Sequence, residues 1–264
     1  MKTVKDIPAF CLSFLIPDLR PHFETKPADI IAHFIGHEGK GSVCAYLKKK
    51  GWIIDLSAGP TERPRYRCAP MFDVEGTLTR DGYGKQSCFI MATAKLITIY
   101  ALHRDFTSSV HYQEVLHAIF EYIALLRSSS FEPYHFSEIS TMSQIRFRFK
   151  EKVQPSDHVN SLSFDLSEPS PVEEILRIPS VIQKWDEALV KNILDLLVPE
   201  KSRAILKARE HDEEVVGKDA KWETERWYGT QYCVQRLNES LFQRVWSSLV
   251  EMIFFELTIV VLTP

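Results

Sequence analysis

The 264-residue sequence lacks the cysteine patterns that mark disulfide-rich or zinc-binding proteins. Its five cysteines are scattered, odd in number and never spaced as Cys-x-x-Cys. This argues against a Cys-type zinc site and against a disulfide framework, and it favours reduced thiols. The N-terminus also has no apolar run of signal-peptide length. We therefore expect a cytoplasmic location, with a mitochondrial one as the alternative.

A strong excess of basic charge is also absent, since the formal net charge is −3. The chain thus has no general attraction for nucleic acid or for an anionic membrane surface. The apolar stretch near the C-terminus is short for a bilayer and contains Glu251 and Glu256, so no membrane span is expected. Gly-x-Ser-x-Gly, P-loop and Rossmann motifs are missing as well, which removes the commonest signatures of hydrolases and nucleotide-binding enzymes.

Hydrophobic periodicity predicts a mixture of strands and helices without regular βαβ alternation, which indicates an α+β fold. We expect strands over 7–16, 52–56, 72–78 and 202–208. We expect helices from Pro27, over 43–50, 110–127 and 134–150, and shorter ones over 157–167 and 186–197. Residues 57–60 are expected to form a turn after the second strand.

The stretch HFIGHEGKGS, residues 33–42, resembles a zinc-protease motif with one ligand missing. His37-Glu38 begins an H-E-x-x-H pattern, but Gly41 occupies the position of the second histidine. A zinc site generally needs three or four protein ligands, so a metal here is the weaker interpretation. The stronger one is that three glycines let the backbone approach another chain closely while His33 and His37, one turn apart, face the same partner.

Two further segments permit a functional interpretation beside a plainer one. His111 and His117 flank a glutamate, but a spacing of six spreads them too widely on a helix for one metal, so we interpret them as part of its polar face. Residues 145–152 alternate basic and aromatic side chains as some nucleic-acid-binding strands do. The acidic net charge favours instead a helix end with Phe147 buried, and no nucleic acid is expected as a partner.

Several segments in one order resemble a known family. They are KPADIIAHFIGHEGKGS (26–42), YLKKKGW (46–52), LSAG (56–59), LTRDG (78–82), FRFKEK (147–152) and WYGTQY (227–232). Together they resemble the second, non-catalytic domain of the insulinase branch of pitrilysin-type inverzincin metallopeptidases. The resemblance covers nearly all of residues 4–240. It implies a layered, antiparallel-rich sheet packed by helices, like the duplicated metallopeptidase domain of that family.

The resemblance also implies a site and its chemistry. In the family, zinc is held in the first domain by H-x-x-E-H, which this sequence lacks, so we expect no catalytic residue, no metal ligand and no cofactor in this chain. Zinc is expected in a catalytic domain elsewhere in the full-length protein. The segment matching GHEGxGS corresponds to an exosite that anchors peptide substrates inside a closed chamber. The residues that match this exosite are His33, Gly36, His37, Gly39, Leu56, Ser57, Ala58 and Gly59.

Two segments depart from the family pattern. Removing residues 84–109 restores the pattern without a gap, which suggests a retained intron translated as protein, whereas the alternative is a genuine surface insertion. The apolar tail, residues 241–264, is either a second mistranslated end or a segment that binds a partner or a membrane surface. We therefore expect one insulinase-type domain over 1–240 with an aberrant insertion, followed by the atypical tail.

Three functions follow from these features. The first is the substrate-binding, non-catalytic portion of an insulinase-type zinc metalloendopeptidase, which binds peptides that a catalytic domain cleaves in a closed chamber. The second is a free-standing peptide-binding or regulatory module. The third is a non-functional product of a truncated, mis-spliced gene, a fragment without activity. In every case the chain alone is expected to be inactive in proteolysis.

Overall fold

A computed structural model describes residues 1, 7–61, 70–83, 111–168, 171–209, 211 and 221–235. The predicted insertion over 84–109 and the predicted tail over 241–264 lie outside the described residues.

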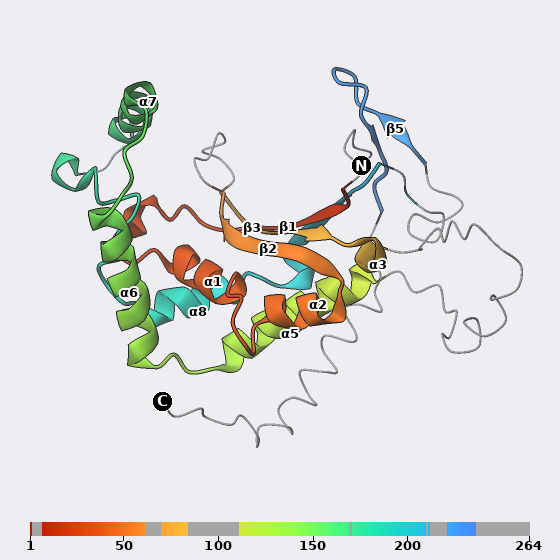
Figure 1. The fold of residues 1–264 in the computed structure, drawn as a ribbon, viewed down its shortest axis with the longest axis horizontal. Coiled ribbons are helices and arrows are strands. Elements are labelled where there is room, and N and C mark those ends of the chain that lie inside the picture. Colours follow the sequence, from red (N-terminus) through yellow and green to blue (C-terminus); the bar gives the residue numbers. More distant parts are fainter. Residues whose placement is uncertain are drawn as a thin grey trace, which may run out of the picture.

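The centre of the fold is a four-stranded antiparallel sheet, which confirms the predicted α+β class (Figure 1). The strands are β1 (Ala9–Leu15), β2 (Ile53–Pro60), β3 (Met71–Leu78) and β4 (Ser202–Lys207). Their order in space is β2-β3-β1-β4, so β2 and β4 form the edges of the sheet over the described residues. The strands at 7–16, 72–78 and 202–208 were predicted correctly. The turn predicted at 57–60 is wrong, because β2 continues to Pro60 in register with β3.

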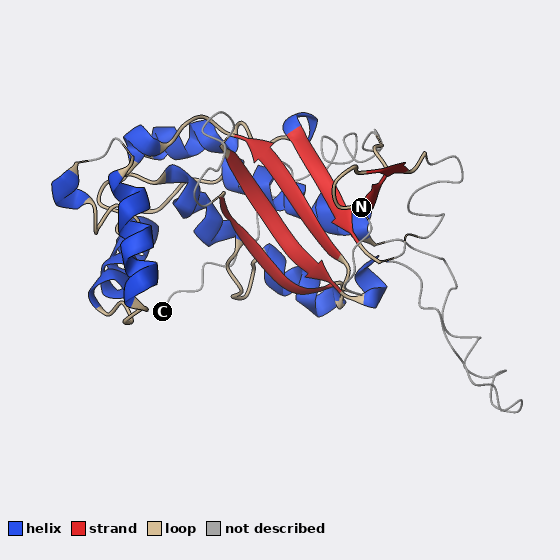
Figure 2. Cartoon of the chain, turned by 90° about the horizontal axis from the view of Figure 1, so that it is seen from above, coloured by secondary structure: helices blue, strands red, loops and turns tan. Residues whose placement is uncertain are grey.

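Helices cover one face of this sheet, and Figure 2 shows no helix of the described residues over the other face. The helices beneath the sheet are α1 (Pro27–Ile35), α2 (Val43–Lys50), α5 (Tyr112–Ser128) and α8 (Glu187–Leu194). A short helix, α3 (Arg80–Tyr83), follows β3 and contacts α5. At one end of the molecule lie α6 (Pro133–Arg148) and α7 (Pro155–Leu166). The other elements of the described residues are three short 3-10 turns, at Arg20–His22, Val172–Glu174 and Pro199–Lys201, and a small hairpin of β5 (Glu223–Thr224) and β6 (Gln231–Tyr232).

Local signals in the sequence set the bounds of α2. The Ser42 hydroxyl accepts a hydrogen bond from the Ala45 amide at 3.1 Å, which satisfies one of the free N–H groups of the first turn. Gly51 ends the helix with a positive φ of 76°, a conformation that costs glycine least. Both ends therefore lie where the sequence predicts them.

The hydrophobic core fills the space between the sheet and the helices beneath it. On the sheet, alternate residues of β1 and β3 point inward, and Leu12, Phe14, Phe72 and Val74 are completely or almost completely buried. Ile30, Ile31 and Ile35 give α1 the apolar face that meets them. Burial of these side chains, each contributing about 1.5–3 kcal/mol, fixes α1 against the sheet.

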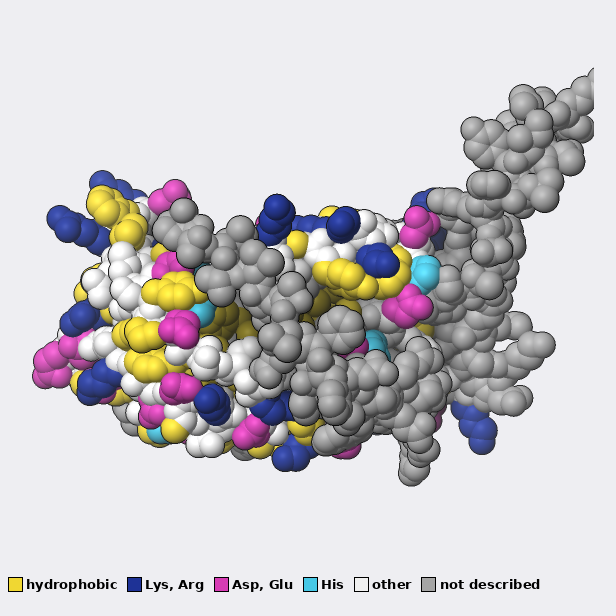
Figure 3. Space-filling view, turned by 90° about the horizontal axis from the view of Figure 1, so that it is seen from below, with side chains coloured by type: hydrophobic (Ala, Val, Ile, Leu, Met, Phe, Trp, Pro, Cys, Tyr) yellow, Lys and Arg dark blue, Asp and Glu magenta, His cyan; other side chains and the backbone are white. Residues whose placement is uncertain are grey.

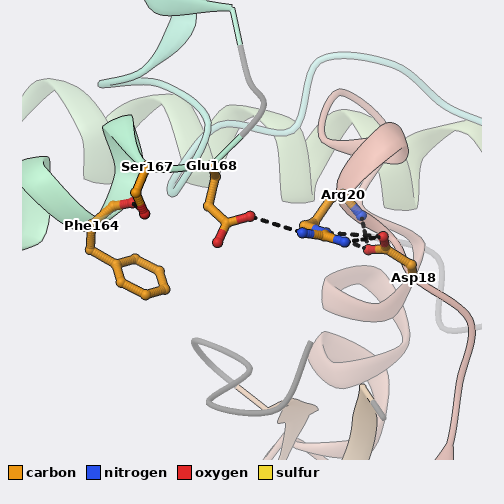
Figure 4. Close-up of polar contacts among 5 residues, drawn as sticks. All are labelled: Asp18, Arg20, Phe164, Ser167 and Glu168. Atoms are coloured by element: carbon orange, nitrogen blue, oxygen red, sulfur yellow. Dashed lines mark hydrogen bonds and ion pairs between the residues drawn. The ribbon is translucent and has the colours of Figure 1, made fainter. Parts of the chain in front are cut away.

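Ion pairs attach the end of α7 to the N-terminal part of the chain. The Arg20 guanidinium donates to both carboxylate oxygens of Asp18 and, at 3.0 Å, to Glu168, which follows α7 (Figure 4). The hydrogen bonds from Arg20 lower the pKa of the Asp18 carboxyl. Helix α7 itself has no buried residue, and exposed hydrophobic side chains lie at this end of the molecule (Figure 3).

Among the described residues, no helix is both long enough and apolar enough to cross a membrane.

Candidate functional site

The end of α1 brings the predicted histidine pair to the surface of the helical layer. His33 lies in the last turn of α1, and the Gly36 amide closes the helix by donating to the Ala32 carbonyl at 2.8 Å. The rings of His33 and His37 are 6.0 Å apart between centroids. His33 is half-buried and His37 is exposed, so the two predicted residues lie side by side at one surface.

The glycines of this loop lie close to their neighbours. A Cβ atom on Gly36 would lie 3.1 Å from the Ala32 carbonyl oxygen and 3.8 Å from the Ala58 nitrogen, so the end of α1 lies close to the backbone of β2. A Cβ atom on Gly39 would lie 2.5 Å from Nε2 of His37, so the imidazole covers this glycine. The predicted site residues of the loop and of β2 are therefore brought together, with His37 at the outer side.

Strand β2 offers free backbone groups along its outer edge. The Thr61 amide donates to the Met71 carbonyl at 2.8 Å and lies opposite it in the continued β2–β3 register. Because antiparallel pairs alternate, the amides of Leu56 and Ala58 then point away from β3, and Pro60 occupies a position where no amide hydrogen is needed. This edge has no strand partner among the described residues.

The predicted residues of β2 differ in exposure. Leu56 is 6% exposed and belongs to the core, Ser57 is exposed, and Ala58 and Gly59 are half-buried. Leu56 and Ala58 point toward the helical layer, while Ser57 and Gly59 point toward the open face of the sheet. A Cβ atom on Gly59 would meet nothing within 4 Å, so this glycine is not required for packing.

The electrostatic surroundings keep His33 uncharged near neutral pH. Burial is the main cause of a lowered pKa for His33, and the neighbouring His37, together with Arg146 and His135, lowers it further. The Glu138 carboxylate acts to raise the pKa of His33. An uncharged imidazole at His33 suits a surface that binds neutral backbone groups or aromatic rings.

The same residues do not form a metal centre. No group of three or more His, Cys, Asp or Glu side chains that could hold a metal is found in the described part of the chain. Glu38, the general base of the zinc motif by analogy, instead pairs with Lys48 at 2.8 Å. The two histidines of the second candidate segment, His111 and His117, also make separate contacts. His111 stacks on Trp52 and forms a hydrogen bond with Glu114, while Nδ1 of His117 lies 3.4 Å from a carboxylate oxygen of Glu121.

A cavity of about 420 Å³ adjoins the histidine pair and was not predicted from the sequence. It lies between α1, α6, the end of β2 and the segment 179–182. Its lining includes Lys26, Asp29, Ala32, His33, Ala58, Ile139, Met142, Ser143, Arg146, Pro179, Ser180 and Ile182. Of the predicted site residues, only His33 and Ala58 reach it.

Hydrogen bonds fix the outer wall of this cavity. The Ser140 hydroxyl donates to the Ile182 carbonyl at 2.9 Å, and the Ile182 amide donates to the Ser143 hydroxyl at 3.2 Å. Segment 179–182 is thus held to α6 by hydrogen bonds from its backbone to serine side chains, and not by strand pairing. No local pattern in the sequence marks these two serines, because their partner is about forty residues away along the chain.

Two family descriptions match the chain. Residues 2–142 match "Peptidase M16 inactive domain", and residues 147–257 match "Middle or third domain of peptidase_M16". The two matches meet near the end of α6. The single domain over 1–240 stays a prediction, as does the separate tail.

Sequence relatives and solved structures agree with these matches. The A-factor-processing enzyme of Saccharomyces cerevisiae is 33% identical over 235 residues, which is 89% of this chain and 19% of that protein. The insulin-degrading enzyme of Homo sapiens is 27% identical over 241 residues, which is 91% of this chain and 20% of that protein. The chain therefore spans about a fifth of the length of these relatives.

Two solved structures share the fold at low sequence identity. The crystal structure of pitrilysin superposes with a TM-score of 0.73 at 18% identity, over 94% of this chain and 22% of that one. An inactive peptidase domain from Bordetella parapertussis superposes with a TM-score of 0.51 at 9% identity, over 80% of this chain and 96% of that one. Both likenesses bear on the fold alone.

Proposed function

Because the chain belongs to the peptidase M16 family and matches its inactive domain, we propose that it binds peptide substrates for an insulinase-type metallopeptidase without cleaving them. The observation that carries this proposal is the edge of β2, which has no strand partner among the described residues and lies beside the end of α1 at Gly36. An extended peptide would add to β2 as a further strand. Main-chain hydrogen bonds would hold it with little demand on its sequence.

The residues of the site have different parts in this proposal. Leu56 and Ala58 supply outward-pointing backbone groups, and Gly36, which has no side chain, brings the end of α1 close to Ala58. His33 and His37 would lie beside one end of the bound peptide. Catalysis, and the zinc that it needs, would come from a catalytic domain of the family, either in the same full-length protein or on another chain.

Substitution of Ala58 by proline tests the edge directly. Proline removes the outward amide and places its ring where the peptide strand would lie, while the bonds from β2 to β3 are kept. Each main-chain hydrogen bond contributes about 0.5–1.5 kcal/mol net. Because several are lost together, Ala58→Pro should weaken binding at least about tenfold, since about 1.4 kcal/mol corresponds to one decade. The measurement is fluorescence anisotropy with a labelled, unstructured, uncharged peptide.

The matched control is Ala204→Pro at the opposite edge of the sheet. Ala208 donates to the Met1 carbonyl and Leu206 accepts from the Met1 amino group, so even-numbered positions of β4 also point outward. Ala204 is half-buried, as Ala58 is. Peptide affinity should be unchanged in Ala204→Pro when circular dichroism shows both variants folded. Equal affinity in wild type and a folded Ala58→Pro would move peptide binding away from β2.

A further inference from the structure

The cavity between α1 and α6 has a lining that the proposed main-chain binding does not use. Its floor is apolar, with Ala32, Ile139 and Ile182. Its charged groups include two cations from distant parts of the chain, Lys26 and Arg146. Within the described structure, neither the Lys26 ammonium nor the Arg146 guanidinium forms an ion pair or a hydrogen bond, although the backbone of Lys26 bonds His22 and Ile30.

The charges of the lining do not cancel. Lys26 is the N-cap residue that precedes α1 and has a left-handed backbone conformation with φ 41°. Burial lowers the pKa of Lys26, and the nearby Asp29 carboxylate opposes that shift. Because His33 stays uncharged near neutral pH, the lining holds the cations Lys26 and Arg146 against the single carboxylate of Asp29. The exposed guanidinium, in the last turn of α6, has the fork geometry that suits a carboxylate.

The cavity lies where a side chain of the docked peptide would point. In a strand, successive side chains point to opposite faces of the sheet, so every second side chain of the peptide faces the helical layer, as Leu56 and Ala58 do. Ala58 itself lines the cavity, so the peptide side chain beside it enters between α1 and α6. A cavity of about 420 Å³ is large enough for one such side chain.

We propose that this cavity selects peptides with an acidic side chain, glutamate above all, opposite Ala58, whose carboxylate binds Arg146 and Lys26. This inference rests on the proposed function and names the class of peptide that the site prefers. The methylene groups of glutamate would lie on the apolar floor, and the carboxylate would reach the cations at the rim. Glutamine has the same shape without the charge, so it isolates the electrostatic part of recognition.

The test compares two labelled peptides that differ only by glutamate or glutamine, with the substitution moved along the sequence one position at a time. At one position of the series the full-length wild-type chain should bind the glutamate peptide about fivefold more tightly, an effect between that of an exposed ion pair and that of a charge-assisted hydrogen bond. The preference should shrink as the salt concentration rises. Arg146→Gln should remove most of it and leave the affinity for the glutamine peptide unchanged.

Two variants complete the test. Arg148→Gln is the matched control, because Arg148 lies on the same helix, stacks over Phe149 and does not line the cavity. The preference for glutamate should persist in that variant. Arg146→Glu should reverse the preference in favour of a lysine peptide.

Failure of the inference and failure of the proposed function give different results. If wild type binds glutamate and glutamine peptides equally at every position, the acidic preference is wrong while edge binding stands. If the preference persists in Arg146→Gln, the carboxylate is recognised elsewhere and the inference is again wrong. If neither peptide binds wild type, the proposed function is wrong and the inference with it.

Discussion

His33 lies where α1, α6 and the glycine loop meet, so its proton affinity depends on all three. Burial lowers its pKa below the ordinary value of 6.5. Near that pH the unfolded chain therefore binds a proton that the folded chain does not. The free energy of unfolding should thus fall as the pH decreases from about 6.5 toward the lowered pKa, and it should recover as the pH rises.

Replacing His33 with glutamine should make stability less dependent on pH in this window. Urea unfolding at about pH 7 and about pH 5.5 measures the difference between the two free energies. The difference should be smaller in His33→Gln than in wild type. His158→Gln, at an exposed position on α7, serves as the control. An identical difference in wild type and His33→Gln would show that the environment of His33 does not disfavour its charged form.

At the scale of single elements, α2 depends on its N-terminal cap. Ser42 is 4% exposed and accepts the Ala45 amide, so Ser42→Ala leaves that donor without its partner in a buried place. The loss should cost about 1 kcal/mol of stability, the usual effect of removing such a cap. Urea unfolding followed by circular dichroism measures it.

Ser137→Ala is the control that distinguishes the loss of the helix cap from a general effect of removing a hydroxyl group. Ser137 is exposed within α6, and alanine favours helix there. We expect this control to be as stable as wild type or slightly more stable. Equal stability of wild type and Ser42→Ala would mean that packing against the sheet alone determines where α2 begins.

On the scale of the whole molecule, the described residues on either side of 84–109 lie in contacting elements. Tyr83 is buried at the end of α3, which contacts α5, and His111, just before α5, stacks on Trp52 with ring centroids 4.8 Å apart. We therefore expect that residue 83 can be joined to the start of α5 with little movement of either element.

Deletion of 84–109 should give a folded protein that melts at the same temperature as wild type or higher. A chain that folds without the segment does not need it for its core, as the retained-intron hypothesis requires. Thermal unfolding by circular dichroism measures the effect, and a second deletion with a Gly-Gly linker controls for strain at the junction. Loss of folding in both deletions would show that the segment packs against the rest of the chain.

The sequence by itself determined the elements whose causes are local. Apolar periodicity gives the faces of α1 and α5, Ser42 and Gly51 set the ends of α2, and ordered motifs identify the family. Such features need only neighbours within a few residues. This is why α1, α2, α5 and three of the four strands were predicted close to their bounds.

Only the tertiary structure decided the features that join distant parts of the chain. Ser57-Ala-Gly-Pro60 has the composition of a turn, yet it forms a strand because β3 supplies hydrogen-bonding partners. The cavity depends on Lys26 and Arg146, which are far apart along the chain and share a site only because α1 packs beside α6. Local sequence patterns do not report such pairings, since hydrogen bonds and charges act across space rather than along the chain.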